Sequence, residues 1–97
     1  MFGEVLSYGR ENAKSKLYLM ELLHMTEWQI RDTARTERLQ GKPICHCKNG
    51  YYLAKDQEEM REFIYFYTHT ATAEYIVYNA LYTTLQGLPE RAKETPA

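Results

Sequence analysis

The amino-acid sequence predicts a mainly α-helical fold with one small β-hairpin, arranged as a winged helix-turn-helix followed by a long C-terminal helix. Three observations lead to this prediction. Apolar residues recur at helical spacing before and after the middle third of the chain. An Asn-Gly pair separates two short β-prone runs between residues 44 and 53. Residues 26–55 carry six basic and three acidic residues, a balance of +3, although the whole chain has a net charge of −1.

Length and composition are typical of one soluble domain. The 97 residues are 44% hydrophobic and 26% charged, and tyrosine is unusually frequent, with nine copies. No apolar run is long enough to cross a membrane, and the N-terminal segment lacks the apolar core of a signal peptide. We therefore expect a cytoplasmic protein that does not contact a membrane.

The chain divides into three parts. Residues 1–9 are expected to form an N-terminal arm, residues 10–88 a single domain, and residues 89–97 a flexible tail. Within the domain, apolar positions three and four residues apart predict a first helix over residues 10–24.

Two short helices are expected next. Thr26 and Gln29 match a capping box, which starts a helix that ends near residue 31 or 32. A second helix is expected over residues 33–40, with Gly41 as its stop. One continuous helix over residues 27–40 is the alternative, because neither Gly nor Pro interrupts this segment.

The hairpin that follows contains the two cysteines of the chain. Strands are expected on both sides of the turn at residues 48–50, with Cys45 and Cys47 facing inward and His46 facing outward. A C-x-C spacing does not match structural zinc sites, so no metal or other cofactor is expected. The chain also lacks the usual catalytic motifs, which argues against an enzyme with a small-molecule substrate.

A long helix is expected over about residues 56–86, with a heptad-like apolar stripe. At 1.5 Å per residue its outer half extends too far for so small a domain to cover. A symmetry mate, a bend that folds the helix back, or another protein would have to cover it. The residues expected in a dimer or partner interface are Tyr67, Tyr75, Ile76, Tyr78, Leu81 and Tyr82.

Basic residues on the second short helix and the hairpin indicate contact with double-stranded DNA. Arg31, Arg35 and Arg38 share one face if the helix is continuous, and Arg pairs bidentately with guanine. A solvated surface helix, with Asp32 and Glu37 balancing the charge, is the alternative. The expected DNA contacts are Arg31, Arg35, Thr36, Arg38, Gln40, Lys42 and Lys48.

Two short motifs resemble a known group. Residues 41–45 read Gly-Lys-Pro-Ile-Cys and residues 50–54 read Gly-Tyr-Tyr-Leu-Ala. Together with the capped helix and the Arg-bearing helix, they resemble the small winged helix-turn-helix proteins of Gram-positive phages and prophages, and the winged-helix module of biotin-repressor-like proteins. The resemblance covers about residues 17–67 and implies DNA binding in phage transcription or replication.

The expected function is therefore duplex DNA binding by a phage or prophage regulator that acts as a homodimer through its last helix. The alternative is a protein-interaction module, such as a phage-encoded inhibitor or adaptor of a host protein. Such a module would use the winged fold as a scaffold and bind through the Tyr-rich last helix and the acidic segment 56–62.

Overall fold

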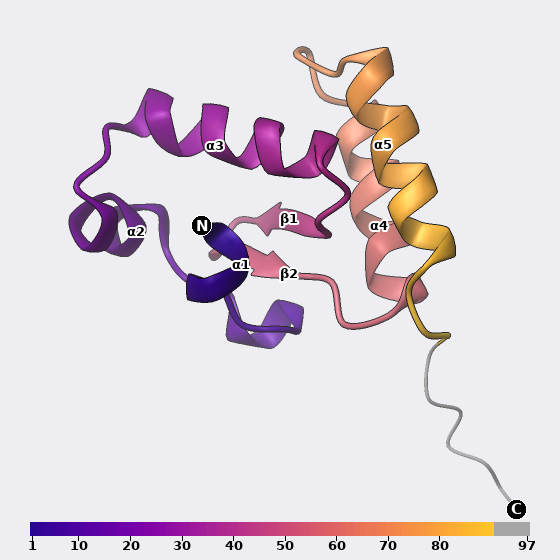
Figure 1. The fold of residues 1–97 in the computed structure, drawn as a ribbon, viewed down its shortest axis with the longest axis horizontal. Helices are drawn as coiled ribbons and strands as arrows, with labels where there is room; N and C mark the ends of the chain where they lie inside the picture. Colours follow the sequence, from indigo (N-terminus) through magenta and orange to yellow (C-terminus); the bar gives the residue numbers. More distant parts are fainter. Residues whose placement is uncertain (91–97) are drawn as a thin grey trace, which may run out of the picture.

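The computed structural model describes residues 1–90, which are mainly helical with one small antiparallel sheet, as the sequence predicts. Figure 1 shows α3 lying across the hairpin, with α4 and α5 side by side at its end and crosswise to α3. The elements are α1 (Phe2–Val5), η1 (Arg10–Asn12), α2 (Lys16–Leu23), α3 (Glu27–Leu39), β1 (Ile44–Cys47), β2 (Gly50–Leu53), α4 (Gln57–Thr68) and α5 (Tyr75–Gln86).

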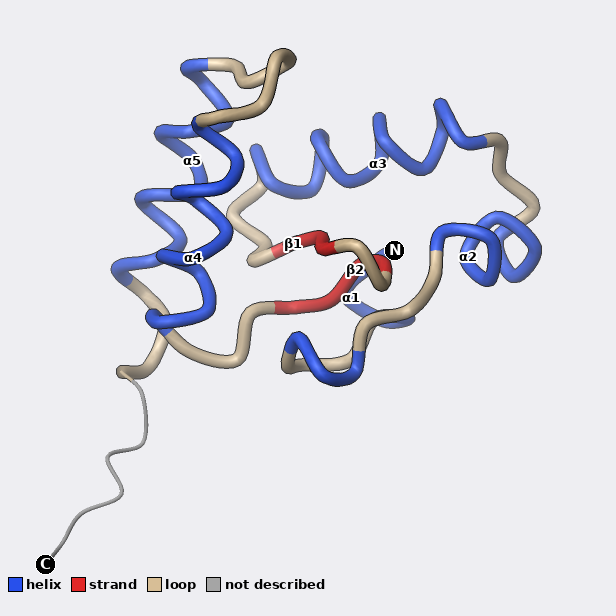
Figure 2. Tube along the Cα trace, turned by 180° about the vertical axis from the view of Figure 1, so that it is seen from behind, coloured by secondary structure: helices blue, strands red, loops and turns tan. Residues whose placement is uncertain are grey.

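The hairpin of β1 and β2 is buried on both faces. Strand partners run from the pair of Ile44 and Leu53 to the pair of Cys47 and Gly50. One face, which includes Tyr51, packs in a hydrophobic cluster with α1, α2 and α3, whereas the other face packs with α4 and α5. The sheet therefore separates two hydrophobic cores. Figure 2 shows the hairpin between α3 and the segment that precedes α2.

α3 is one continuous helix, so the prediction of two short helices over residues 26–40 is wrong and the single-helix alternative is correct. The capping box between Thr26 and Gln29 is present. Ile30 and Ala34 bury the same face, which favours an unbroken helix. The helix ends as expected before Gly41, which has a φ of 91°.

The helix predicted over residues 10–24 is corrected: Arg10–Asn12 form the separate short helix η1, residues 13–15 are extended, and α2 begins only at Lys16. The amide of Lys14 donates to the carbonyl of Tyr51, and the Tyr51 amide donates back to the Lys14 carbonyl. This segment therefore extends the sheet beside β2. The Ser15 side chain then caps α2 by accepting from the Tyr18 amide.

The N-terminal residues are packed and do not form a free arm. The ring of Phe2 is fully buried, and its amide donates to both carboxylate oxygens of Glu37 on α3 at 3.0 Å. Burial alone would raise the pKa of Glu37, but the Phe2 amide and nearby Lys42 outweigh it, so the pKa lies below its usual value.

The predicted long helix is broken, and the break folds α5 back along α4 (Figure 1). The amides of His69 and Thr70 end α4 by bonding back to the carbonyls of Phe66 and Tyr67. A straight helix would leave Val77, Leu81 and Leu85 in water, whereas the bend buries them against α4. Of the three ways to cover this stripe, the chain thus uses the bend.

The end of the described chain also contacts the body. The amide of Gln57 donates to the carbonyl of Pro89 at 2.8 Å. The rest of the expected tail, residues 91–97, lies outside the described residues. Within residues 1–90 no helix combines the length and apolarity needed to span a membrane.

We predict that Gly50→Ala destabilises the protein by about 2 kcal/mol or more. Gly50 has a φ of 130°, and a Cβ there would overlap the carbonyl of Lys14, which bonds across to Tyr51. Urea unfolding should show a lower midpoint. The control is Gly87→Ala, since Gly87 has a φ of −90° and a Cβ there would lie 3.6 Å from the carbonyl oxygen of Thr84, an ordinary van der Waals contact. Equal midpoints for the two variants would contradict this account of the sheet.

Candidate nucleic-acid interface and adjoining cleft

The side chain of Arg38, one of the expected base contacts, is buried and makes its contacts within the protein. Its side chain is 6% exposed; Nε donates to the carbonyl of Ile44 at 2.7 Å and Nη2 donates to Nδ1 of His46 at 3.3 Å. Its guanidinium carbon lies 4.9 Å from the centre of the Phe63 ring. Arg38 is therefore not placed to reach a base edge in a groove.

Arg35 is bound to Glu74, the residue that precedes α5. Its Nε and Nη2 donate to the two carboxylate oxygens at 2.6 and 2.9 Å. This bidentate pair lowers the pKa of Glu74 and raises that of Arg35. Both side chains are near 40% exposed, so the pair contributes little to stability, but it links α3 to the turn between α4 and α5.

The remaining expected DNA contacts do not form one surface. Lys42 lies against Gly3 and pairs with Glu37 at 3.4 Å, beside α1. Thr36 and Gln40 are exposed on the outward face of α3. Arg31 and Lys48 are also exposed. The spacing of the three arginines did place them on one flank of α3, but that flank is turned toward α4 and α5.

A second group of cations gathers where the hairpin turns, and we call it the wing-end patch. Lys16 and Lys48 line one shallow pocket of about 260 Å³, and Arg10 and Lys48 line a neighbouring one. Lys14 lies on the strand segment beside β2. Tyr51 lines the same pocket as Lys16 and Lys48, and on its other side it shares a cleft with Arg31. The wing-end patch comprises Arg10, Lys14, Lys16, Arg31 and Lys48.

Most of the wing-end patch has no acidic partner. Within residues 1–90, no carboxylate lies within 4.0 Å of the side-chain nitrogens of Arg10, Lys14, Arg31 or Lys48, whereas Lys16 pairs with Glu27 at 2.9 Å. Sequence reasoning missed the three N-terminal cations because residues 1–25 carry as many acids as bases. Only the pairing of this segment with β2 brings them to the hairpin turn.

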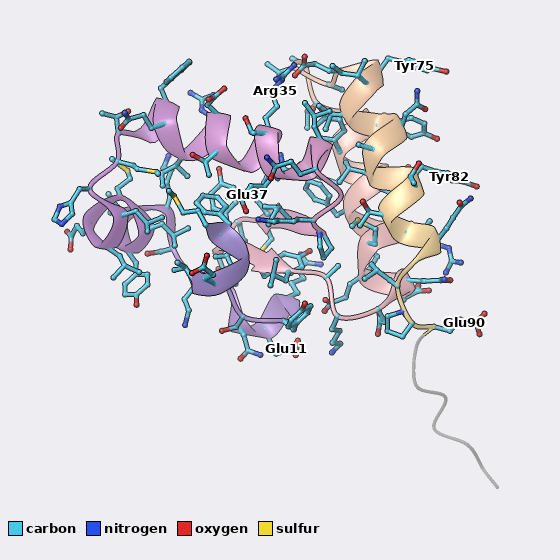
Figure 3. All side chains as sticks on the ribbon, in the orientation of Figure 1. Glu11, Arg35, Glu37, Tyr75, Tyr82 and Glu90 are labelled. Carbon is cyan, nitrogen blue, oxygen red and sulfur yellow. The ribbon has the colours of Figure 1, made fainter. Side chains whose placement is uncertain are left out.

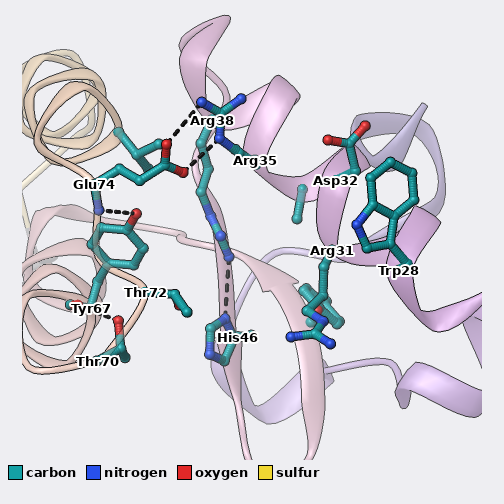
Figure 4. Close-up of a pocket in the computed structure, with 13 residues that line it drawn as sticks. Trp28, Arg31, Asp32, Arg35, Arg38, His46, Tyr67, Thr70, Thr72 and Glu74 are labelled. Carbon is teal, nitrogen blue, oxygen red and sulfur yellow. Dashed lines mark hydrogen bonds and ion pairs between the residues drawn. The ribbon is translucent and has the colours of Figure 1, made fainter.

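A cleft of about 430 Å³ separates the arginine flank of α3 from the turn that joins α4 to α5. Arg31, Arg35 and Arg38 line it from α3, and His46 lines it from β1. Figure 4 shows Arg38 extending to His46, Arg31 on the side of the cleft near Trp28, and Glu74 on the opposite side, bonded to Arg35. Asp32 also lines the cleft from α3, so three arginines and one carboxylate leave this side with a positive balance.

His46 does not face solvent, contrary to expectation. Its ring packs edge-on against Phe63 and Phe66, with centroids 5.2 and 5.4 Å apart. Burial, reinforced by Arg38, lowers the pKa of His46 to about 4. The imidazole is thus neutral at pH 7, which lets its Nδ1 accept the bond from Arg38.

The two cysteines share a face of the hairpin, as expected from their spacing. Both are free thiols, and burial raises the pKa of Cys45 to about 12, so its thiol stays protonated. Within the part of the chain that the structure describes, no three His, Cys, Asp or Glu side chains are grouped as metal ligands.

The expected interface residues divide between core and surface. Tyr67 and Leu81 are buried between α4 and α5, which removes them from any intermolecular contact, and Tyr78 is half-buried. The exposed members are Tyr75, at 77%, together with Ile76 and Tyr82. Figure 3 shows Tyr75 and Tyr82 projecting away from the body of the protein.

The acidic segment 56–62 is not a continuous negative surface. The Asp56 side chain caps α4 by accepting from the Glu59 amide. Glu59 is also buried and accepts from the amides of Arg10 and Lys55. These bonds weaken the idea that this segment imitates DNA toward a basic partner.

We predict that the ring protons of His46 titrate with a midpoint near pH 4 in nuclear magnetic resonance spectra, because the folded state disfavours the imidazolium. Replacing Arg38 by Met should raise that midpoint, since it removes the neighbouring charge and leaves the ring in place. His46 also costs stability as the pH falls from 6.5 toward 4, where only the unfolded chain takes up the proton. A midpoint near 6.5 would contradict the placement of this ring.

Comparisons with known proteins leave the function to be argued from these contacts. No protein-family model, no curated protein and no solved structure matches the chain.

Proposed function

We propose that this protein binds double-stranded DNA as a winged helix-turn-helix regulator, with the wing-end patch on the phosphate backbone. The observation that carries the proposal is the position of the wing-end patch, whose cations lie on α3, on the hairpin turn, and along the chain from η1 to the start of α2. These are the parts of a winged helix that approach a duplex.

The order of elements supports this proposal. α2 and α3 are joined by only three residues, 24–26, which matches the short connection of a helix-turn-helix. The hairpin follows α3 directly, and the segment at Lys14 pairs with β2, so three chain segments lie side by side as in a winged sheet. α3 then corresponds to the recognition helix and residues 48–49 to the tip of the wing.

The charges favour phosphate contact over base readout. Arg35 and Arg38 are engaged within the protein. On the outward side of α3 the exposed polar groups are Thr36 and the C-cap residue Gln40, and neither is basic. Cations on phosphates position a protein and supply most of its non-specific affinity. We therefore propose modest, salt-dependent binding as the main component of the interaction.

We predict that Arg31→Gln and Lys48→Gln each weaken binding to a short duplex by about threefold to tenfold at low salt, and that each lowers the salt slope by about one unit. Fluorescence anisotropy at several salt concentrations measures both quantities. The matched control is Lys42→Gln, since Lys42 pairs with Glu37 on another side of the molecule. Equal losses in all three variants, or no binding by the unmodified protein at low salt, would refute the proposed interface.

A second proposal concerns α5 and the expected dimer. We propose that its exposed face forms a contact between two copies, because α5 contains no charged residue and exposes Tyr75, Ile76 and Tyr82. In a two-fold interface the same face of both copies is in contact. A face without charged residues can form such an interface without repulsion between like charges. Large exposed aromatic side chains are typical of such contacts.

We predict that the double variant Tyr75→Lys/Tyr82→Lys is monomeric under conditions in which the unmodified protein is dimeric, because it places like charges on both copies. Light scattering measures the mass. Tyr8→Lys is the control, since the exposure of Tyr8, 60%, lies between those of Tyr75 and Tyr82, and Tyr8 lies near the N-terminus. If the unmodified protein stays monomeric at high concentration, the proposed dimer is refuted. The exposed face of α5 would then be assigned to contact with a different protein, such as a host factor.

A further inference from the structure

Arg38 is a buried cation whose charge no carboxylate balances. Its near neighbours are neutral: the carbonyl of Ile44, the imidazole of His46 and the ring of Phe63. Within residues 1–90, no Asp or Glu lies within 4.0 Å of its guanidinium. Burial lowers the pKa of Arg38, the direction expected for an uncompensated cation. Burying an unpaired ion costs several kcal/mol, of which a cation–π contact offsets only a part.

This cation lies in the wall of the cleft described above. Arg31 and Arg35 line the same cleft, so three guanidinium groups border one cavity (Figure 4). The volume of about 430 Å³ lies in the range of small-ligand sites. Opposite the arginines, Thr70 and Thr72 supply hydroxyl groups. The Tyr67 hydroxyl accepts a hydrogen bond from the Glu74 amide, and its own proton remains available for donation to a ligand.

One of these three guanidinium groups, that of Arg35, is already bound to Glu74. Its carboxylate binds Arg35 in the bidentate geometry that a phosphate or carboxylate ligand would also adopt. Because the pair is partly exposed, exchanging one anion for another at Arg35 costs little. The turn between α4 and α5 would then be released from α3 by a ligand that replaces Glu74.

We propose that this cleft binds a small anion that carries phosphate or carboxylate groups, with Arg31 and Arg38 as its main cationic contacts and Arg35 exchanging Glu74 for it. The site shares Arg31 with the proposed DNA contacts, whereas Arg35 and Arg38 belong to the cleft alone. A duplex is too wide to enter a cavity of this size, so its phosphates would reach the exposed Arg31 but not the buried Arg38.

The first experiment titrates the protein with sodium pyrophosphate against sodium chloride at matched ionic strength. Trp28 is the only tryptophan in the chain and lines the cleft, so its fluorescence reports occupancy directly. Amide shifts in nuclear magnetic resonance spectra locate the site. We expect a saturable response confined to α3, β1 and the turn at residues 69–74. A response equal to that of chloride would overturn the proposal.

Four variants test the assigned contacts. Arg31→Gln should weaken pyrophosphate binding by about fivefold or more, and Arg38→Met should abolish it. Glu74→Gln should strengthen binding severalfold, because it frees Arg35 and removes a competing charge. Lys42→Gln should leave it unchanged. Arg31 and Glu74 lie at the protein surface, so these two variants decide the matter even if Arg38→Met fails to fold. Binding that ignores both substitutions would overturn the proposal.

A competition experiment separates a free small anion from a DNA phosphate. Pyrophosphate should still saturate the cleft in the presence of excess short duplex, with its affinity reduced only through the shared Arg31. Complete displacement by duplex, combined with loss of duplex binding in Arg38→Met, would identify the anion as a backbone phosphate. That result would overturn the assignment of a small ligand.

Discussion

The arrangement of this protein depends on a two-stranded hairpin that is buried on both faces. One face of β1 and β2 completes a core with α1, α2 and α3, and the other completes a core with α4 and α5. A two-stranded hairpin has little stability of its own, so both sets of helices are needed to hold it. This explains the close approach at Gly50, where the Lys14 backbone lies against β2. The two halves also meet directly where α3 contacts α5 and where Arg35 pairs with Glu74.

The packing of the hairpin also determines which arginine side chains of α3 remain accessible from outside the protein. The hairpin face that carries His46 lies beneath the helix flank that carries Arg38, and burial keeps the imidazole neutral and able to accept. α5 and the turn before it cover the flank from the other side, where Glu74 meets Arg35. Arg31, nearer the start of the helix, is the one arginine of the three that is fully exposed at the surface. On an isolated helix the three arginines would form one row that could enter the major groove of DNA. In this protein Arg38 is buried, Arg35 is paired with Glu74, and Arg31 is exposed at the surface.

Sequence reasoning succeeded where local chemistry is sufficient. Thr26 caps α3, Gly41 follows its end, and the hairpin forms around residues 48–49, because each signal acts through its immediate neighbours. It failed where distant contacts decide. The turn at residues 69–74 contains neither Gly nor Pro, and only the burial of α5 against α4 accounts for it. Likewise, the wing-end patch and the burial of Arg38 follow from strand pairing and from the docking of α4 and α5, which no spacing rule describes.

The two proposed interaction surfaces lie at opposite ends of the fold, which constrains how they can act together. α2 is at one end of the long axis and α5 is at the other, and the hairpin between them has its turn on the side of α2 (Figure 1). A two-fold contact through α5 would therefore hold two wing-end patches far apart, facing away from the dimer axis. Regulators that read adjacent half-sites need their recognition elements about 34–36 Å apart, one helical turn of DNA. Dimerisation through α5 instead favours two separated duplex segments, or two distant sites on one duplex. The oligomer would then increase avidity by linking independent contacts, and each wing-end patch would keep its own affinity.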